Sequence, residues 1–113
     1  MEVYMAQRKL KFFVYCPDEK EIINKIINVA SKEGAGVYGN YSQVVFITHG
    51  VGNWKSEKGA NPLQGRLGKV TRAPVAKIEM TCPRKLAEQI EVAIKHVHPW
   101  EQVDIEFVKI EEI

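Results

Sequence analysis

The chain repeats one pattern twice, and this repeat is what most constrains its fold. A predicted strand ends at Cys16-Pro17 and a predicted helix follows, and the same arrangement recurs at Cys82-Pro83. Each helix leads into a further strand, so the order is β-α-β, long loop, β-α-β. Two such halves in 113 residues can interleave into one sheet with both helices on one face. We therefore predict an α+β, ferredoxin-like βαββαβ sandwich with a four-stranded antiparallel sheet in the order 4-1-3-2.

Hydrophobic periodicity separates the strands from the helices. Four segments alternate apolar and polar residues or concentrate β-branched ones, as strands do. They are residues 9–16, 42–49, 75–82 and 103–110. Two segments, residues 18–33 and 83–97, carry apolar residues at helical spacing. Asp18 is the expected N-cap of the first helix, and Gly34 and Gly36 are expected to end it.

The two cysteines test this topology. In the predicted sheet, Cys16 and Cys82 end neighbouring antiparallel strands and therefore lie at opposite ends of the sheet. A seven-residue strand is about 23 Å long, whereas a disulfide needs α-carbons within about 7 Å. We predict two reduced thiols, which agrees with a cytoplasmic location.

Composition indicates one small globular domain over residues 1–113, since apolar residues make up 45% and charged residues 27% of the chain. No apolar run approaches the roughly 20 residues of a membrane helix. Residues 1–8 are expected to be a flexible N-terminus. Residues 1–9 lack the apolar core and the small-residue cleavage site of a signal peptide. A net charge of +2 does not imply a general nucleic-acid surface. The expected protein is cytoplasmic, with neither a membrane nor a nucleic acid as its partner.

The sheet face turned away from the helices is not uniformly polar. If the apolar partners of the first strand face the helices, Phe13 and Tyr15 point outward from a central strand. Glu79 lies on the outer face of the third strand. An uncovered aromatic patch usually marks an interface, so we predict a homo-oligomer with these three residues at its interface. The alternative is ordinary exposed aromatic residues.

A long glycine-rich loop is predicted over residues 50–74. From His49 to Pro74 the basic residues outnumber the acidic ones by a formal charge of +4. Glycine-rich backbone with cationic side chains can hold an anion, and Trp54 could anchor a partner. A solvated surface loop remains the alternative. The candidate ligand-binding residues, taken from this loop and from the turn after the second helix, are Lys55, Arg66, Lys69, His98 and Glu101.

A divalent metal is a second candidate ligand. His49, His98 and Glu101 are of types that bind transition metals. In the predicted sheet the two histidines belong to opposite edges, about 14 Å apart at about 4.8 Å per strand. A shared site would therefore need a neighbouring subunit or a large loop movement. His98 could instead interact with the dipole at the helix C-terminus. No motif requires a cofactor.

Six short motifs occur in a fixed order along the chain. They are Gly34-Ala35-Gly36, Gly39-Asn40-Tyr41-Ser42, Thr48-His49-Gly50-Val51-Gly52, Gly59-Ala60-Asn61-Pro62, Lys77-Ile78-Glu79 and His98-Pro99-Trp100-Glu101. As a set, over residues 9–110, they resemble the CutA/PII-like domain inserted in NIF-three-like proteins, the type 2 homologues of GTP cyclohydrolase I. The resemblance implies a ferredoxin-like fold and trimeric or higher association. It also puts the long loop in the place of the PII effector loop.

The sequence departs from that family in two ways. The host proteins carry a two-metal site on a separate α/β scaffold, and that scaffold has no counterpart in these residues, so its hydrolase activity is not expected here. His49 and Arg72 stand where the family usually has acidic residues. Both changes make the loop less acidic and favour an anionic partner.

These observations favour a non-catalytic, oligomeric, stand-alone PII/CutA-like binding or regulatory module. The loop and the motif at residues 98–101 would meet at clefts between subunits, and the ligand would be a small anion, a metal ion or a partner protein. One alternative is a metal-dependent enzyme with an inter-subunit site built from Glu79, His98 and Glu101. Another is a structural partner of a separate NIF-three-like scaffold.

Overall fold

The computed structural model describes residues 8–111 and 113. The predicted flexible N-terminus therefore lies, apart from Arg8, outside the described residues. The elements in chain order are β1 (Lys9–Pro17), α2 (Lys20–Lys32), β2 (Phe46–Lys55), β3 (Val70–Pro83), a 3-10 turn (Arg84–Leu86), α3 (Ala87–Val97) and β4 (Ile105–Lys109). None of the described helices has the length and the apolar character that crossing a membrane would need.

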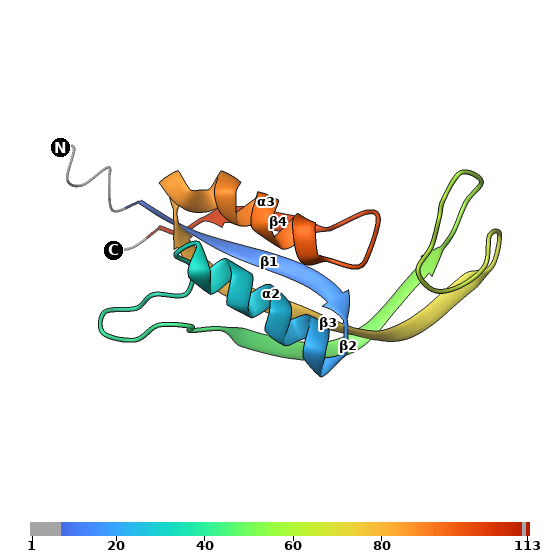
Figure 1. The fold of residues 1–113 in the computed structure, drawn as a ribbon, viewed down its shortest axis with the longest axis horizontal. Coiled ribbons are helices and arrows are strands. Elements are labelled where there is room, and N and C mark those ends of the chain that lie inside the picture. The colour runs from blue at the N-terminus through green and yellow to red at the C-terminus, as the bar shows by residue number, and fades with distance from the viewer. Residues whose placement is uncertain (1–7, 112) are drawn as a thin grey trace.

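The four strands form one antiparallel sheet in the order β2-β3-β1-β4. This is the predicted order read from the other edge, so the ferredoxin-like topology is confirmed. Helices α2 and α3 lie side by side over the sheet (Figure 1). β1 is a central strand, and its Phe12 is opposite Met80 on β3 and Phe107 on β4.

The core lies between the sheet and the two helices. Every second residue of β1 is buried, which places Phe12 and Val14 at zero exposure, and Ile78 of β3 lies beside them. The Phe12 ring packs against Phe107 with ring centroids 5.4 Å apart. Burying each such side chain contributes about 1.5–3 kcal/mol. The helices add Ile23, Ile26, Ile27, Ala30, Ala87, Ile90 and Ile94.

Of the two predicted ends of α2, the C-terminal end agrees with the structure and the N-terminal cap does not. Gly34 follows the helix with φ +107°, a left-handed conformation that favours glycine, so the predicted stop is confirmed. The predicted N-cap is wrong. The N-cap position is Glu19, and it makes no side-chain capping bond. Asp18 instead directs its carboxylate to the His49 ring, with Oδ2 2.8 Å from Nδ1. A tertiary partner thus replaces the local cap.

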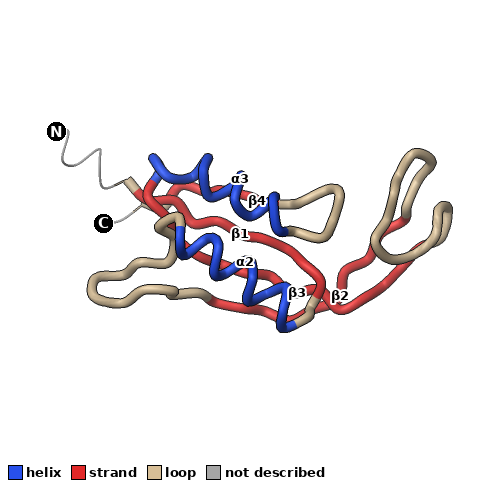
Figure 2. Tube along the Cα trace, in the orientation of Figure 1, coloured by secondary structure: helices blue, strands red, loops and turns tan. Residues whose placement is uncertain are grey.

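The β2–β3 hairpin is longer than predicted. β2 continues to Lys55 and β3 starts at Val70, so the loop covers residues 56–69 rather than 50–74. Figure 2 shows these strands running past the ends of the helices before the loop begins. Cross-strand contacts explain the extension, because Asn53 pairs with Arg72 and accepts a 2.8 Å hydrogen bond from its Nε. Gly52 suits this hairpin, since a Cβ there would lie 2.5 Å from Val75 Cγ2.

The two cysteines occupy opposite ends of the sheet, as predicted. Cys16 lies near the end of β1, opposite Ala76 in the middle of β3, whereas Cys82 lies near the end of β3, opposite Leu10 near the start of β1. Both thiols are free and buried.

Candidate functional site

The outer sheet face carries the residues proposed from the sequence as interface candidates. Strand register aligns Phe46, Glu79, Phe13 and Glu106 in one row across the four strands. Tyr15 lies on the same face of β1, two residues after Phe13. Lys77 covers part of this face, because its Nζ lies 4.5 Å from the centroid of the Phe13 ring and 3.7 Å from a Glu79 carboxylate oxygen. Phe46 is left 64% exposed.

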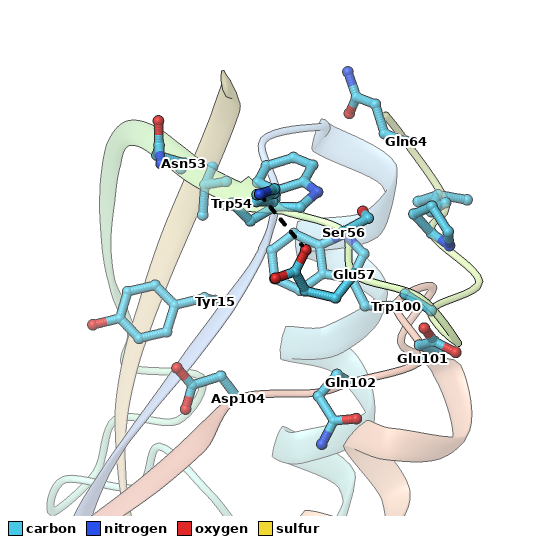
Figure 3. A pocket seen from close by; sticks show the side chains of 16 residues that line it. Tyr15, Asn53, Trp54, Ser56, Glu57, Gln64, Trp100, Glu101, Gln102 and Asp104 are labelled. Carbon is cyan, nitrogen blue, oxygen red and sulfur yellow. Dashed lines mark ion pairs between the residues drawn. The ribbon is translucent and has the colours of Figure 1, made fainter. Parts of the chain in front are cut away.

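A cavity of about 520 Å³ opens at one end of this face. Its wall combines β1, the end of β2 with the following loop, and the segment between α3 and β4, as Figure 3 shows. These segments are distant in the sequence and meet only in the folded chain. The lining side chains that bear on its chemistry are Tyr15, Trp54, Glu57, Trp100, Glu101 and Asp104.

Aromatic rings form one wall of the cavity. Trp54 and Trp100 lie with centroids 6.5 Å apart and planes inclined by 51°. The His98 ring also packs against Trp100, with ring centroids 5.2 Å apart. Such tilted pairs are a favourable arrangement of aromatic rings. The rings thus hold the end of β2 against the segment after α3.

His98 is a structural residue in this arrangement. It is 8% exposed, and its Nε2 lies 2.8 Å from the Tyr15 carbonyl oxygen. Its Nδ1 lies 3.1 Å from the Trp100 amide nitrogen and must accept that proton. The proton of the neutral ring therefore sits on Nε2, which donates to Tyr15. Burial lowers the pKa of His98, and the Tyr15 hydrogen bond opposes this in part.

Glu101 fixes the position of the loop. Its Oε1 accepts a 2.7 Å hydrogen bond from the Asn61 backbone amide. This bond joins residues 56–69 to the segment between α3 and β4. Glu101 therefore joins the loop to this segment and is also part of the cavity lining.

The basic residues proposed as ligand-binding are not gathered at the cavity. Lys55 lines it and lies 3.9 Å from a Glu57 carboxylate oxygen. Arg66 and Lys69 are on the loop over residues 56–69 but outside the lining. The charged side chains of the lining are one lysine and three carboxylates, Glu57, Glu101 and Asp104, a formal charge of −2. The loop is basic, whereas the cavity beside it is acidic.

The candidate metal ligands are not brought together within one subunit. His49 lies in the middle of β2 opposite Ala76, not at the strand end as predicted, because β2 continues to Lys55. It pairs with Asp18, while both His98 ring nitrogens are engaged in hydrogen bonds. Among residues 8–111 and 113, no three His, Cys, Asp or Glu side chains gather closely enough to hold a metal ion.

Sequence reasoning missed part of this site. It singled out Trp54 and Glu101 but not the lining roles of Trp100 and Asp104. A signal was present, because the chain has two tryptophans and one of them lies in the motif at residues 98–101.

No protein-family model matches the chain. Several curated proteins are similar to it in sequence, and they bear the name GTP cyclohydrolase 1 type 2 homolog. The protein from Listeria innocua is 34% identical over 102 residues, covering 89% of this chain and 27% of the relative. The protein from Bacillus subtilis is 28% identical over 102 residues, covering 90% and 27%. The chain thus spans about a quarter of the length of the curated relatives it matches.

Solved structures of similar fold point to the same relatives. A Bacillus cereus protein related to NIF3 superposes with a TM-score of 0.80 at 24% identity, covering 95% of this chain and 27% of that one. The periplasmic divalent cation tolerance protein CutA from Archaeoglobus fulgidus superposes with a TM-score of 0.69 at 14% identity, covering 92% and 85%. The fold is therefore that of a CutA-like domain. The chain is a relative of the NIF3-related GTP cyclohydrolase 1 type 2 homologues, and the resemblance found in its motifs is confirmed.

Proposed function

We propose that this chain is a non-catalytic binding and regulatory module whose cavity receives a small ligand. The main support for this proposal is the cavity, whose volume of about 520 Å³ falls within the range of roughly 300–1,000 Å³ that is typical of small-molecule binding sites. Aromatic rings line it together with a few polar groups, including the hydroxyl-bearing Ser56, which is 5% exposed. This combination of apolar surface and sparse polar groups is typical of ligand sites.

The regulatory part of the proposal concerns the loop. Residues 56–69 are joined to the segment after α3 by the Asn61–Glu101 hydrogen bond. A ligand that bonds Glu101 competes with Asn61, so occupancy of the cavity changes the position of the loop. The loop in turn presents a different surface to a partner protein. We also propose a cytoplasmic location, and two free thiols are compatible with a reducing compartment.

Oligomer formation is also part of this proposal. The outer sheet face continues into the cavity through Tyr15. It carries Phe46, 64% exposed, beside Glu79. We expect a homo-oligomer, by resemblance a trimer, that joins subunits through this face and puts the cavity at a cleft between them.

Sedimentation tests the oligomer. Phe46→Asp sets a second carboxylate opposite Glu79 and should shift the wild-type assembly towards the monomer at micromolar concentration. Val92→Asp, at a 68% exposed position on α3, is the matched control and should leave the assembly intact. A wild-type protein that sediments as a monomer under these conditions would contradict the oligomer.

Thermal shift against a chemically diverse metabolite panel tests the cavity. Ala60 lines it, so Ala60→Phe places a ring at its wall and narrows it, whereas Lys58→Phe adds the same ring to the same loop outside the lining. A ligand should raise the melting temperature of the wild type and of Lys58→Phe but not of Ala60→Phe. A panel in which every stabilising compound acts equally on all three proteins would overturn the proposal.

A further inference from the structure

The cavity combines two features that favour positive charge. The faces of aromatic rings carry negative electrostatic potential and attract cations, most strongly for tryptophan. Trp54 and Trp100 are both half-buried lining residues, so part of each ring remains accessible from the cavity. The second feature is the set of carboxylates in the same lining.

Those carboxylates are only partly compensated by protein groups. Lys55 lies 3.9 Å from a Glu57 oxygen, and both side chains are more than half exposed, so the pair is weak. Glu101 accepts one backbone N–H, which leaves its formal charge in place. Asp104, immediately before β4, adds a third carboxylate. The lining therefore keeps a formal charge of −2, which favours a positively charged ligand.

The geometry points to a small organic cation as the ligand, bearing an ammonium or guanidinium group that contacts the tryptophan rings and the carboxylates. This inference rests on the proposed binding function of the cavity. A phosphate or carboxylate ligand would enter a partly enclosed space next to three like charges, and Arg66 and Lys69, which could offset them, lie outside the lining. The basic loop alone favoured an anionic ligand, but the charge of the cavity lining favours a cationic one.

The cavity offers a selective readout. The chain has two tryptophans, and both line the cavity. Fluorescence excited where tyrosine does not absorb therefore reports on this site. Three probes separate the ligand classes: choline, its neutral carbon isostere in which a tert-butyl group replaces the trimethylammonium group, and adenosine monophosphate.

We expect choline to change the tryptophan fluorescence saturably, with an affinity at least about tenfold above that of the neutral isostere. Asp104→Asn should reduce choline affinity about threefold to tenfold and leave the isostere unchanged. Glu88→Gln, an equivalent carboxylate-to-amide change at an exposed position on α3 outside the cavity lining, is the control and should change neither.

Two results would overturn the cation inference. One is equal affinity for choline and the isostere, and the other is a preference for adenosine monophosphate. A third outcome separates the two proposals. If none of the three probes binds, but the metabolite panel yields a ligand whose stabilising effect is abolished by Ala60→Phe, the cation inference fails and the proposed binding function stands. If the panel is also silent, both fail.

Discussion

His98 joins the end of α3 to the central strand through a hydrogen bond from its Nε2 to the Tyr15 carbonyl oxygen, 2.8 Å long. Its Nδ1 accepts the Trp100 amide at 3.1 Å. One neutral imidazole thus links β1, the end of α3 and the aromatic wall of the cavity. Protonation would place a second N–H where the Trp100 amide already points.

Stability should therefore depend on pH through His98. Burial lowers its folded-state pKa below the ordinary 6.5, so the unfolded chain binds the proton first as the pH falls. The contribution of His98 is complete above about pH 6.5 and is lost progressively below it, until the pH reaches the lowered folded-state pKa. Urea unfolding at neutral pH and at about pH 5 measures this loss.

Two variants isolate the His98 contribution. His98→Gln can keep a donor for Tyr15 without titrating, so it should lower stability at neutral pH by about 1 kcal/mol and flatten the acid dependence. His96→Gln, at an exposed position in the last turn of α3, should keep the wild-type pH dependence. An unchanged acid slope in His98→Gln would refute this assignment.

The Glu101–Asn61 hydrogen bond should control the mobility of the loop over residues 56–69. Glu101→Ala removes the acceptor, and the Asn61 amide should then exchange its hydrogen about threefold to tenfold faster. Hydrogen exchange read at single-residue resolution measures the change. Gln102→Ala, next in the chain, is the control. Equal protection of Asn61 in all three proteins would show that the bond does not hold the loop.

The two thiols should be inert in the folded protein. Burial raises the pKa of Cys16 to about 12, with a further increase from Asp18. Burial also raises the pKa of Cys82 to about 11, opposed in part by Arg84. The thiolate is the reactive form, so an aromatic disulfide reagent should label neither cysteine in buffer and both in urea. Rapid labelling of the native protein would contradict this burial.

The contact of Phe12 with Phe107 lies at the centre of the core. Phe12→Ala should cost about 3–5 kcal/mol because it leaves a cavity among fully buried side chains. Val92→Ala, at a 68% exposed position, should change the free energy of unfolding by less than about 0.5 kcal/mol. Denaturant unfolding measures both. A loss below about 1 kcal/mol in Phe12→Ala would mean that the core repacks around the gap.

Much of the fold could be predicted because it depends on local spacing. The alternation along β1 and the helical spacing of Ile23, Ile26 and Ile27 each identify a buried face without knowledge of the rest of the chain. The errors arose where distant residues compete with local signals. Asp18 is a good capping residue by type, but His49 of β2 takes its carboxylate. Residues 50–55 look like a glycine-rich loop, but β3 pairs with them.

The sequence by itself determined the β-α-β order, the strand arrangement and the opposite placement of Cys16 and Cys82, since periodicity and two interleaved halves leave few alternatives. Only the tertiary structure decided the charge of the cavity. The formal charge of the loop counts every residue along the chain, whereas a ligand meets the side chains that line the cavity. Asp104 and Glu101 come from beyond the loop, and Arg66 and Lys69 lie outside the lining. That selection follows from strand register and side-chain direction, which composition does not contain.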